Sequence, residues 1–582
     1  MRKVLLTLCL IAMTTATWGA RALTTPFTVV QPDGTQLTVI LHGDEDFSWY
    51  TTLDDILLVN ENEHFLIAMV DEDGQLLSTN ILAHNKELRK ESERTAIALQ
   101  EKSRFLEQVP AVKRKNMMRR ISIGDYNPPY FPHVGSPKAV VILVEFADST
   151  FSMPNPRKTF NDYLNGEAPF TNEGFREDRN YGSVREYFNY VSGGQFTPQF
   201  DIYGPVKLPK ELGYYGQDQG KNDKDININE MMNKACQLMN DSLDFNQYDA
   251  NGDGYVDLVY FIYAGYSQSV GAPSYSIWPK SGLAVLNQFD GKYVRRYGLN
   301  NELNYLPDYK FSAPPYKRIN GIGLFCHEFS HTLGLPDLYA KDDQAKIDNQ
   351  CMEYWDLMDY GEYTDNGYRP TPYTPWEKEV MGWVELEELT EPAIITMAEQ
   401  DAYKITNSEN KEYLILHNIQ QNGWSGKMLG HGLLVYRIDY KKSSVNLSDY
   451  PNNTAGKPSV TVVAADGLLI NGDNTAHTKL EHQQSHAGDP YPGSKNVTEL
   501  LSVQMNETTI EKPLYDITEE NGTITFKFLD KNLGTGIAGL MLKERNNEDK
   551  RIYTMDGQLV GSTLLNLPKG IYIQAGKKLV VR

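Results

Sequence analysis

Apolar and polar residues alternate along much of residues 23–112, as in TVVQPDGTQLTVILHGDEDF, and Asp-Gly pairs separate the alternating runs. This pattern predicts short strands joined by tight turns. The polar stretch HNKELRKESERTAIALQEKSRFLEQ at 84–108 predicts a helix. A basic, proline-flanked segment, VKRKNMMRRISIGDYNPPYFP, follows and marks an exposed linker that a protease could cut between Lys113 and Arg120. A propeptide that ends in this linker explains the arrangement, and a permanent N-terminal domain is the alternative.

The pattern changes at about residue 138, where strands and helices alternate. AVVILVEFAD and DLVYFIYAGY predict buried strands, and GSVREYFNYVS predicts a short amphipathic helix. Beyond about 390 the chain is rich in strands and turns, as in EYLILHNIQ, GHGLLVYRIDY and TITFKFLD, which favours a β-sandwich-like module. RIYTMDGQLV and GIYIQAGKKLVVR near the end predict two further strand pairs. A chain of 582 residues is too long for one hydrophobic core, so we expect a multidomain α+β protein with segments 1–22, 23–120, 121–390, 391–532 and 533–582.

The first segment has the features of a signal peptide. Met1, Arg2 and Lys3 precede the apolar run VLLTLCLIAM, and small residues end in Ala20-Arg21-Ala22. We therefore expect the mature chain to begin near Leu23. No later segment offers the roughly 18 uninterrupted apolar residues of a membrane-spanning helix, so we expect a secreted or surface-associated protein with no integral membrane segment.

The net charge bears on the binding partners, and the cysteine content bears on disulfide pairing. With 56 Lys+Arg and 76 Asp+Glu the net charge is −20, which opposes binding to polyanions, so we expect no nucleic-acid partner. Apart from Cys9 in the predicted signal, the chain has Cys236, Cys326 and Cys351. One of these thiols must stay free, while a Cys326–Cys351 disulfide and two isolated buried thiols are both compatible with the sequence.

The stretch GIGLFCHEFSHTLGLPDLY at 321–339 carries a metal-binding pattern, His-Glu-x-x-His. Residues four apart on a helix lie about 6 Å apart along the axis and roughly 40° apart around it, so His327 and His331 can share one zinc ion. Glu328 adjoins the first ligand, where it can act as a general base toward water. Two core histidines on a helix are the alternative interpretation.

The residues after the motif predict a third ligand. Gly334 lies three residues after His331, where it can end the helix, and Asp337 lies three residues further on. Two histidines and a carboxylate with one open position are typical of catalytic zinc, whereas structural zinc sites usually contain more cysteine. Glu353 and Glu377 are the fallback ligands, and a third ligand at Glu377 would instead favour an aminopeptidase.

Four segments resemble the immune inhibitor A type of secreted metalloprotease: HEFSHTLGLPDLY, WDLMDYG, PWEKEVMGW and DANGDGYVDLVYFIYAG. The resemblance covers roughly residues 25–530. It implies a zinc endopeptidase acting on protein or peptide substrates, with a β-rich propeptide, a metzincin-like α/β catalytic domain and a β-sandwich-like domain after it. Metzincins also have a Met-x-Tyr turn beneath the zinc, which implies that Met358 forms the floor and that Tyr360 points at the metal or substrate. There the Tyr360 phenol is expected to assist catalysis by steadying an oxyanion. Asp337 stands where many metzincins have histidine.

A second metal site is predicted at Asp249, Asn251, Asp253, Tyr255 and Asp257, which have the alternate spacing of an EF-hand-like calcium loop. Position twelve is Tyr260 instead of glutamate, so we expect weak or differently completed structural calcium binding. An Asx-rich turn without calcium is the alternative.

Three further expectations concern the whole chain. Residues 23–120 contain no cysteine, so a carboxylate among Asp44, Glu45 and Asp46 is expected to block the zinc site in a latent precursor, with steric blocking as the alternative. The tail IYTMDGQLVGSTLLNLPKGIYIQAGKKLVVR resembles C-terminal sorting domains of secreted Bacteroidetes proteins, which implies contact with a secretion machinery. A rival function is a surface adhesin or glycan-binding protein with a degenerate protease domain.

Overall fold

The structure is a computed structural model of the chain. It describes residues 16–61, 64–109, 129–153, 155–166, 180–218, 224–304, 317–407, 412–440, 445, 449–472, 477–534, 552–554, 559–561, 570–574 and 577–581. The basic linker at 113–120 and most of the predicted signal peptide lie outside this part. None of the helices in these ranges is both long enough and apolar enough to span a membrane.

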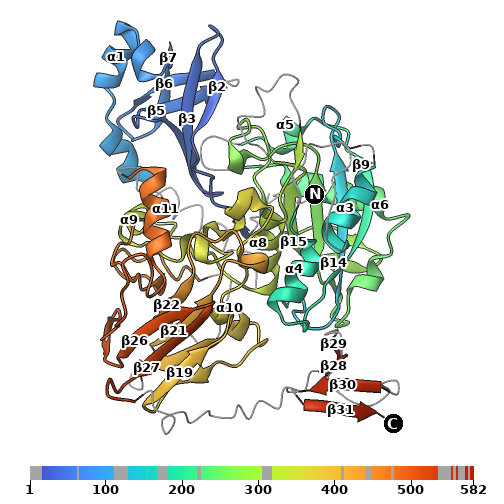
Figure 1. Ribbon diagram of the computed structural model, residues 1–582. Helices are drawn as coiled ribbons and strands as arrows, with labels where there is room; N and C mark the ends of the chain where they lie inside the picture. The colour runs from blue at the N-terminus through green and yellow to red at the C-terminus, as the bar shows by residue number, and fades with distance from the viewer. Residues whose placement is uncertain are drawn as a thin grey trace, which may run out of the picture.

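The N-terminal unit is one antiparallel sheet in which each strand pairs with the next along the chain (Figure 1). Burial alternates along its second strand, with every other residue in the core, as the predicted short strands require. The prediction of a single helix over 84–108 is wrong, because the helical segments are interrupted at Gln100. The Gln100 side chain forms hydrogen bonds with the backbone of Leu57 and Ala68. The elements are β2 (Phe27–Val30), β3 (Gln36–Gly43), β4 (Ser48–Thr52), β5 (Leu57–Glu61), β6 (His64–Val70), β7 (Leu76–Leu82), η1 (Lys86–Leu88) and α1 (Glu91–Ala98).

The central unit is a six-stranded sheet in the order β1-β12-β15-β11-β8-β9. The four strands β15, β11, β8 and β9 are parallel to one another. At one edge of the sheet, β12 pairs antiparallel with both β15 and β1. Both predicted buried strands, β8 and β11, are present, and alternate residues of β8 enter different cores on the two faces. The strands are β1 (Ala16–Gly19), β8 (Lys138–Glu145), β9 (Gln199–Lys207), β11 (Val259–Tyr263), β12 (Lys280–Leu283) and β15 (Arg296–Asn301).

Helices cover both faces of this sheet. Residues of α3, α4 and α8 share one core with it, and residues of α6 share the other. The predicted helix at 182–192 is α4, whose N-terminus has a capping box between Ser183 and Glu186. The helices are α3 (Pro156–Asn165), α4 (Val184–Val191), α5 (Leu212–Tyr215), α6 (Ile228–Met239), η2 (Phe245–Tyr248), η3 (Gln268–Val270), α8 (Ile322–Leu333), α9 (Asp343–Asp348), η4 (Glu353–Trp355), η5 (Tyr360–Gly367) and α10 (Pro375–Val380). Short strands are β10 (Tyr255–Val256), β13 (Gln288–Phe289), β14 (Lys292–Val294), β16 (Leu303–Asn304) and β17 (Arg318–Ile319).

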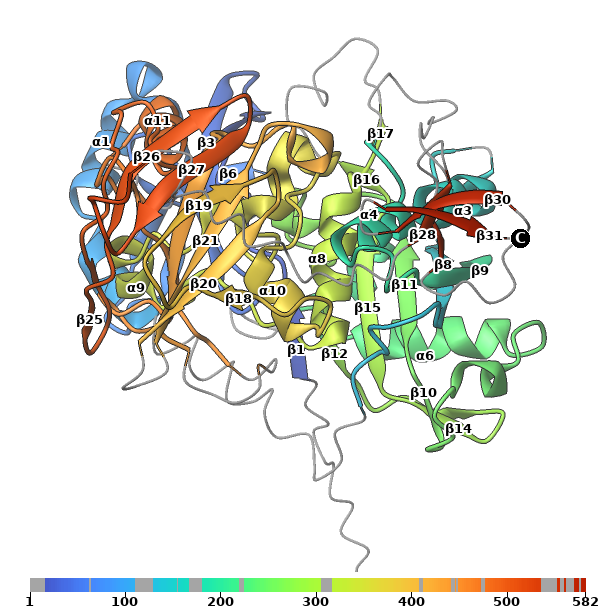
Figure 2. The same ribbon diagram turned by 60° about the horizontal axis from the view of Figure 1, so that its bottom comes forward.

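Two sheets follow, in the orders β18-β20-β21-β22-β23 and β19-β27-β26, with an apolar core between them. The opposite face of β21 and β22 contributes Ile415, Leu434 and Tyr436 to the core of the central unit. Figure 2 shows the same contact, with β20 and β21 beside α10. The elements are β18 (Glu387–Glu388), β19 (Ala393–Met397), β20 (Ala402–Thr406), β21 (Tyr413–Ile419), η6 (Gly423–Ser425), β22 (Gly432–Ile438), β23 (Val460–Val462), α11 (Lys479–Gly488), β24 (Val503–Gln504), β25 (Thr509–Ile510), β26 (Leu514–Glu520) and β27 (Thr523–Phe528).

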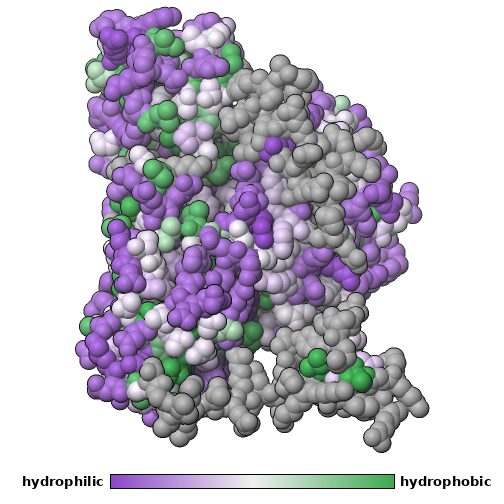
Figure 3. Space-filling view, in the orientation of Figure 1, coloured by the Kyte–Doolittle hydropathy of each residue, from purple (hydrophilic) through white to green (hydrophobic). Residues whose placement is uncertain are grey.

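The last described segments form a separate four-stranded sheet at the C-terminal end (Figure 1). Two of its three antiparallel pairings, β28 with β29 and β30 with β31, agree with the predicted strand pairs. The strands are β28 (Ile552–Thr554), β29 (Leu559–Gly561), β30 (Gly570–Gln574) and β31 (Lys577–Val581). The coloured face in Figure 3 is mainly hydrophilic, in keeping with the net charge of −20. Cys236, Cys326 and Cys351 are all free and buried, which excludes the disulfide alternative.

Candidate metal centre and peptide cleft

The two motif histidines lie on α8, which is buried along its whole length. The helix ends at Gly334, whose φ of 110° lies in the left-handed region that favours glycine. The chain then turns back and brings Asp337 alongside the helix. The predicted helix and its stop are therefore both present.

Three side chains converge as the sequence predicts. Asp337 Oδ1 lies 3.4 Å from His327 Nε2 and 3.2 Å from His331 Nε2. Tetrahedral ligands with bonds of about 2.0–2.1 Å to zinc have donor atoms about 3.3 Å apart. The ligand atoms of these three residues form one of the two candidate metal-binding groups among the described residues. Their spacing fits a zinc ion.

The other ring nitrogens determine which imidazole atoms can bind a metal. His327 Nδ1 donates to the carbonyl of Leu357 at 3.0 Å, and His331 Nδ1 donates to that of Leu335 at 2.7 Å. Both Nε2 atoms are buried and have no hydrogen-bond partner among the described residues. Such backbone acceptors hold the tautomer in which the Nε2 lone pair faces a metal. These rings therefore fit metal ligation better than ordinary core packing.

Buried carboxyl groups near His327 affect its pKa and have shifted pKa values of their own. Burial opposes a charge on His327, but Glu362 and Asp337 raise its pKa to about 10. Burial also raises the pKa of Glu362 to about 8 and that of Glu328 well above its ordinary value. Surroundings that favour a cationic imidazole also favour a bound cation. Nothing in the motif pointed to Glu362, which the fold brings from η5.

The two fallback ligands lie elsewhere. Glu377 caps α10 and accepts the backbone N–H of Thr374 at 2.7 Å. Glu353 accepts the backbone N–H of Gly472 at 3.1 Å. Neither belongs to the group formed by the two histidines and Asp337. The geometry therefore favours Asp337 as the third ligand.

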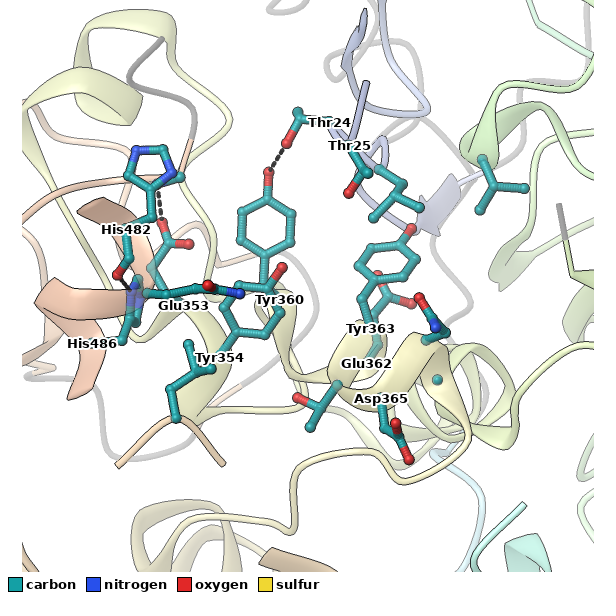
Figure 4. Close-up of a pocket in the computed structure, with 18 of the residues that line it drawn as sticks. Thr24, Thr25, Glu353, Tyr354, Tyr360, Glu362, Tyr363, Asp365, His482 and His486 are labelled. Atoms are coloured by element: carbon teal, nitrogen blue, oxygen red, sulfur yellow. Dashed lines mark hydrogen bonds between the residues drawn. The ribbon is translucent and has the colours of Figure 1, made fainter. Parts of the chain in front are cut away.

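The Met-x-Tyr segment packs against the metal-binding residues. Met358 is fully buried, and its carbonyl accepts the N–H of Leu338 at 2.8 Å. The preceding carbonyl, of Leu357, is the one that holds His327. The Tyr360 hydroxyl lies 3.3 Å from Thr24 Oγ1 (Figure 4).

Comparison with known proteins finds similarity to metalloproteases. Residues 129–384 match the immune inhibitor A peptidase M6 catalytic domain. The chain is 24% identical over 306 residues to the pre-pro-metalloprotease PrtV of Vibrio cholerae serotype O1 (strain M66-2), which covers 45% of this chain and 32% of that protein. It is 24% identical over 287 residues to immune inhibitor A of Bacillus thuringiensis subsp. alesti, which covers 43% of this chain and 40% of that protein. The similar segment thus spans less than half of each relative. Residues 129–384 are similar to the catalytic domain of immune inhibitor A-type metalloproteases and are called the M6 domain below for that similarity.

The N-terminal segment of the chain passes through the M6 domain as an extended strand. β1 pairs antiparallel with the edge strand β12, with Gly19 opposite Lys280. The next residue, Ala20, donates its N–H to Glu328 Oε1 at 2.8 Å. Strand addition of this kind is a common mode of peptide recognition. The cleft beside Glu328 can therefore accommodate an extended polypeptide.

Aromatic side chains hold the backbone of this segment. Tyr339 donates to the carbonyl of Gly19 at 2.8 Å, and Trp278 donates to that of Ala20 at 2.9 Å. The Gly19–Ala20 peptide bond thus lies between the Tyr339 hydroxyl and the Glu328 carboxylate. No motif in the sequence pointed to Tyr339, although it stands only two residues after Asp337.

The cleft continues into a cavity of about 600 Å³. The segment from Leu23 to Pro26 forms one wall, and the opposite wall comes from the M6 domain and α11. Figure 4 shows Thr24 facing Tyr360, with Glu353, His482 and His486 on the far side.

The acidic turn of the N-terminal unit also reaches the metal centre. Asp44, Glu45 and Asp46 are buried and form the second candidate metal-binding group among the described residues. Glu45 Oε1 accepts from Lys341 Nζ at 2.8 Å, and the same Nζ lies 2.9 Å from Asp337 Oδ2. The turn therefore contacts the third candidate ligand through Lys341.

The predicted calcium loop, Asp249 to Asp257, follows η2 directly and includes β10. Asp249 accepts the N–H groups of Asp253 and Gly254 at 3.0 Å each, and Lys292 Nζ lies 2.6 Å from it. Among the described residues, these carboxylates do not form one of the groups of three with close ligand atoms. The contacts are those of an Asx-type turn, and calcium binding stays a prediction.

Proposed function

We propose that this chain is a secreted zinc-dependent endopeptidase that hydrolyses protein or peptide substrates and is made as a latent precursor. The observation that carries the proposal is the placement of Glu328 between two groups. Its carboxylate interacts electrostatically with His327 and Asp337, and it also accepts the N–H of a peptide bond in the cleft. The similarity to two metalloproteases supports the same activity.

The residues divide the chemistry among them. His327, His331 and Asp337 would hold the zinc ion, which would supply Lewis acidity toward a carbonyl oxygen and toward water. Glu328 acts as general base for the attacking water and then passes the proton to the leaving amide nitrogen, at the place of the Ala20 N–H. Tyr339 donates to the carbonyl oxygen, at the place of the Gly19 carbonyl, where negative charge develops.

Internal cleavage fits the cleft better than removal of terminal residues. The bound segment has residues on both sides of the Gly19–Ala20 bond: β1 precedes it, and Arg21 to Thr24 follow it with contacts of their own. A cleft open at both ends accepts the interior of a chain, so an aminopeptidase is not favoured. The adhesin alternative leaves the arrangement of Glu328 and the three ligands without a purpose.

Latency follows from occupancy of the cleft. The segment that continues from Leu23 toward the N-terminal sheet lines the cavity, and Glu45 reaches Asp337 through Lys341. A substrate cannot enter until this segment leaves. We propose that cutting in the Lys113–Arg120 linker releases the N-terminal unit, and that the C-terminal sheet engages a secretion machinery.

Replacing Glu328 tests the proposal. Glu328→Ala should keep near-stoichiometric zinc but reduce hydrolysis of a denatured protein at least about 10²–10⁴-fold, because proton transfer contributes to the chemical step. Zinc is measured by elemental analysis and turnover by peptide mapping. His331→Ala, the matched control on the same helix, should lose zinc. Undiminished turnover in Glu328→Ala would refute the assignment.

A further inference from the structure

A buried pocket in the M6 domain holds the side chain of Arg21. The Arg21 guanidinium is 2% exposed, and its Nη1 lies 3.4 Å from Asp359 Oδ1, which is fully buried. The guanidinium carbon lies 4.0 Å from the ring centroid of Tyr360 and 5.6 Å from that of Tyr339. A carboxylate and the faces of two aromatic rings are the chemistry that recognises a cation. We call Asp359, Tyr360 and Tyr339 the arginine pocket.

Contacts within the M6 domain position the arginine pocket. Asp359 Oδ2 accepts the backbone N–H groups of Met352 at 3.2 Å and Glu353 at 2.8 Å, so the other oxygen is held toward Arg21. Tyr360 stacks on Tyr354, with centroids 5.5 Å apart and an interplanar angle of 16°. A pocket held by its own domain keeps its shape for another occupant, which lowers the cost of binding.

The arginine pocket lies a fixed number of residues from the peptide bond that would be cut. Arg21 follows Ala20, the residue whose N–H contacts Glu328, and the Arg21 carbonyl accepts from the Tyr363 hydroxyl at 2.6 Å. A substrate that follows the same path places its second residue after the scissile bond in the arginine pocket. Removal of residues 1–22 as a signal peptide would vacate the pocket for that residue.

We propose that the M6 domain selects protein substrates by binding an arginine two positions C-terminal to the scissile bond in the arginine pocket. The inference rests on the proposed peptidase function and names its substrate class. Arginine is favoured over lysine because its planar guanidinium can stack on Tyr360 while it pairs with Asp359. A neutral side chain of the same shape would leave the Asp359 carboxylate buried without that cationic partner.

Four peptides that differ only at this position test the proposal: arginine, lysine, citrulline and norleucine. With the active, zinc-loaded protein, kcat/KM should be highest for arginine and about 10- to 100-fold lower for citrulline, which keeps the shape but lacks the charge. Mass spectrometry of the products should place the cut two residues before the arginine. Equal rates for arginine and citrulline, or a preference at another position, would overturn the proposal.

Binding to zinc-loaded Glu328→Ala separates this inference from the proposed function. The arginine peptide should bind at least about 10-fold more tightly than the citrulline peptide, even if no peptide is hydrolysed. Absence of hydrolysis by the unmodified protein counts against the peptidase function, whereas equal Kd values count against the arginine pocket.

Two variants locate the selectivity. Asp359→Asn should reduce the arginine-to-citrulline ratio to near one. Asp365→Asn is the matched control, because Asp365 also lines the cavity but lies 4.0 Å from Lys427 instead of Arg21. It should leave the ratio unchanged. Zinc content and the unfolding midpoint establish that both variants are folded, and a ratio that survives in Asp359→Asn or falls in Asp365→Asn overturns the assignment.

Discussion

At the residue scale, Tyr360 and Tyr339 contact different parts of the segment in the cleft, whereas the sequence pointed to Tyr360 alone. The Tyr360 hydroxyl lies beside Thr24, and its ring faces Arg21. The Tyr339 hydroxyl instead donates to the Gly19 carbonyl, on the peptide bond next to Glu328. Burial raises the pKa of Tyr339 well above its ordinary value, so the phenol remains a proton donor. We therefore propose Tyr339 as the group that stabilises the oxyanion.

Removing each hydroxyl separates the two roles. Tyr339→Phe should lower kcat by about 10²-fold with a smaller change in KM, because a donor to the developing oxyanion acts mainly in the transition state. Tyr360→Phe keeps the aromatic face and should lower kcat by less than about 5-fold. Steady-state kinetics on one peptide give both values. A larger loss of kcat in Tyr360→Phe would restore the assignment made from the Met-x-Tyr resemblance.

At the scale of elements, the loop at 249–257 combines an Asx-type turn with the predicted calcium ligands. Its carboxylates accept backbone N–H groups of the loop, and Lys292 from the neighbouring β14 contacts Asp249. Burial raises the pKa of Asp257 to about 6, and Asp249 and Asp253 contribute. Because the folded pKa exceeds the unfolded one, the apo loop loses stability as the pH rises from about 4 to 6. Bound calcium would offset this loss.

Calcium should therefore raise the unfolding midpoint at pH 7.5, since a ligand that binds only the folded state stabilises it. The rise should shrink below pH 6, where Asp257 takes up a proton. Asp253→Ala should abolish the rise, and Lys292→Met should enlarge it by removing a competing cation from Asp249. Differential scanning calorimetry with and without millimolar calcium measures the effect. An unchanged midpoint in the unmodified protein would refute the site.

At the scale of the whole molecule, the M6 domain and the following β-sandwich share a core. β21 and β22 direct alternate residues to opposite sides: Leu414 and Leu416 face the sandwich core, whereas Ile415, Leu434 and Tyr436 join the core that contains Phe329 of α8. The segments on the two sides of the boundary expected at residue 390 therefore share one core, although the sandwich also has a core of its own. The same core packs against the metal-binding helix, so the sandwich supports the site.

A chain that ends at residue 390 should lose cooperative unfolding and zinc. It lacks Ile415, Leu434 and Tyr436, and burying each such side chain contributes about 1.5–3 kcal/mol, so the loss approaches the about 5–15 kcal/mol that stabilises a typical domain. A chain that ends at residue 534 is the control, because it keeps every residue of the shared core. Thermal unfolding and zinc content of the two chains are compared. A chain ending at 390 with the same midpoint as the control would contradict the shared core.

Local sequence determined the metal-binding helix and much of the secondary structure. His327, Glu328 and His331 lie within five residues, so helical periodicity alone places both imidazoles on one face. Gly334 and Asp337 follow His331 closely in the sequence. The alternation of buried residues in β3 and the apolar run of β8 are equally local patterns. Such patterns depend on interactions between near neighbours, which the sequence displays directly.

Only the tertiary structure decided which distant residues meet at the cleft. Ala20 contacts Glu328 across 308 residues, and Arg21 contacts Asp359 across 338. No periodicity links such positions, because the path of β1 depends on a free edge at β12 and on pockets that several elements build together. The choice between Tyr339 and Tyr360, the arginine pocket and the shared core arise from packing between segments that are far apart in the chain.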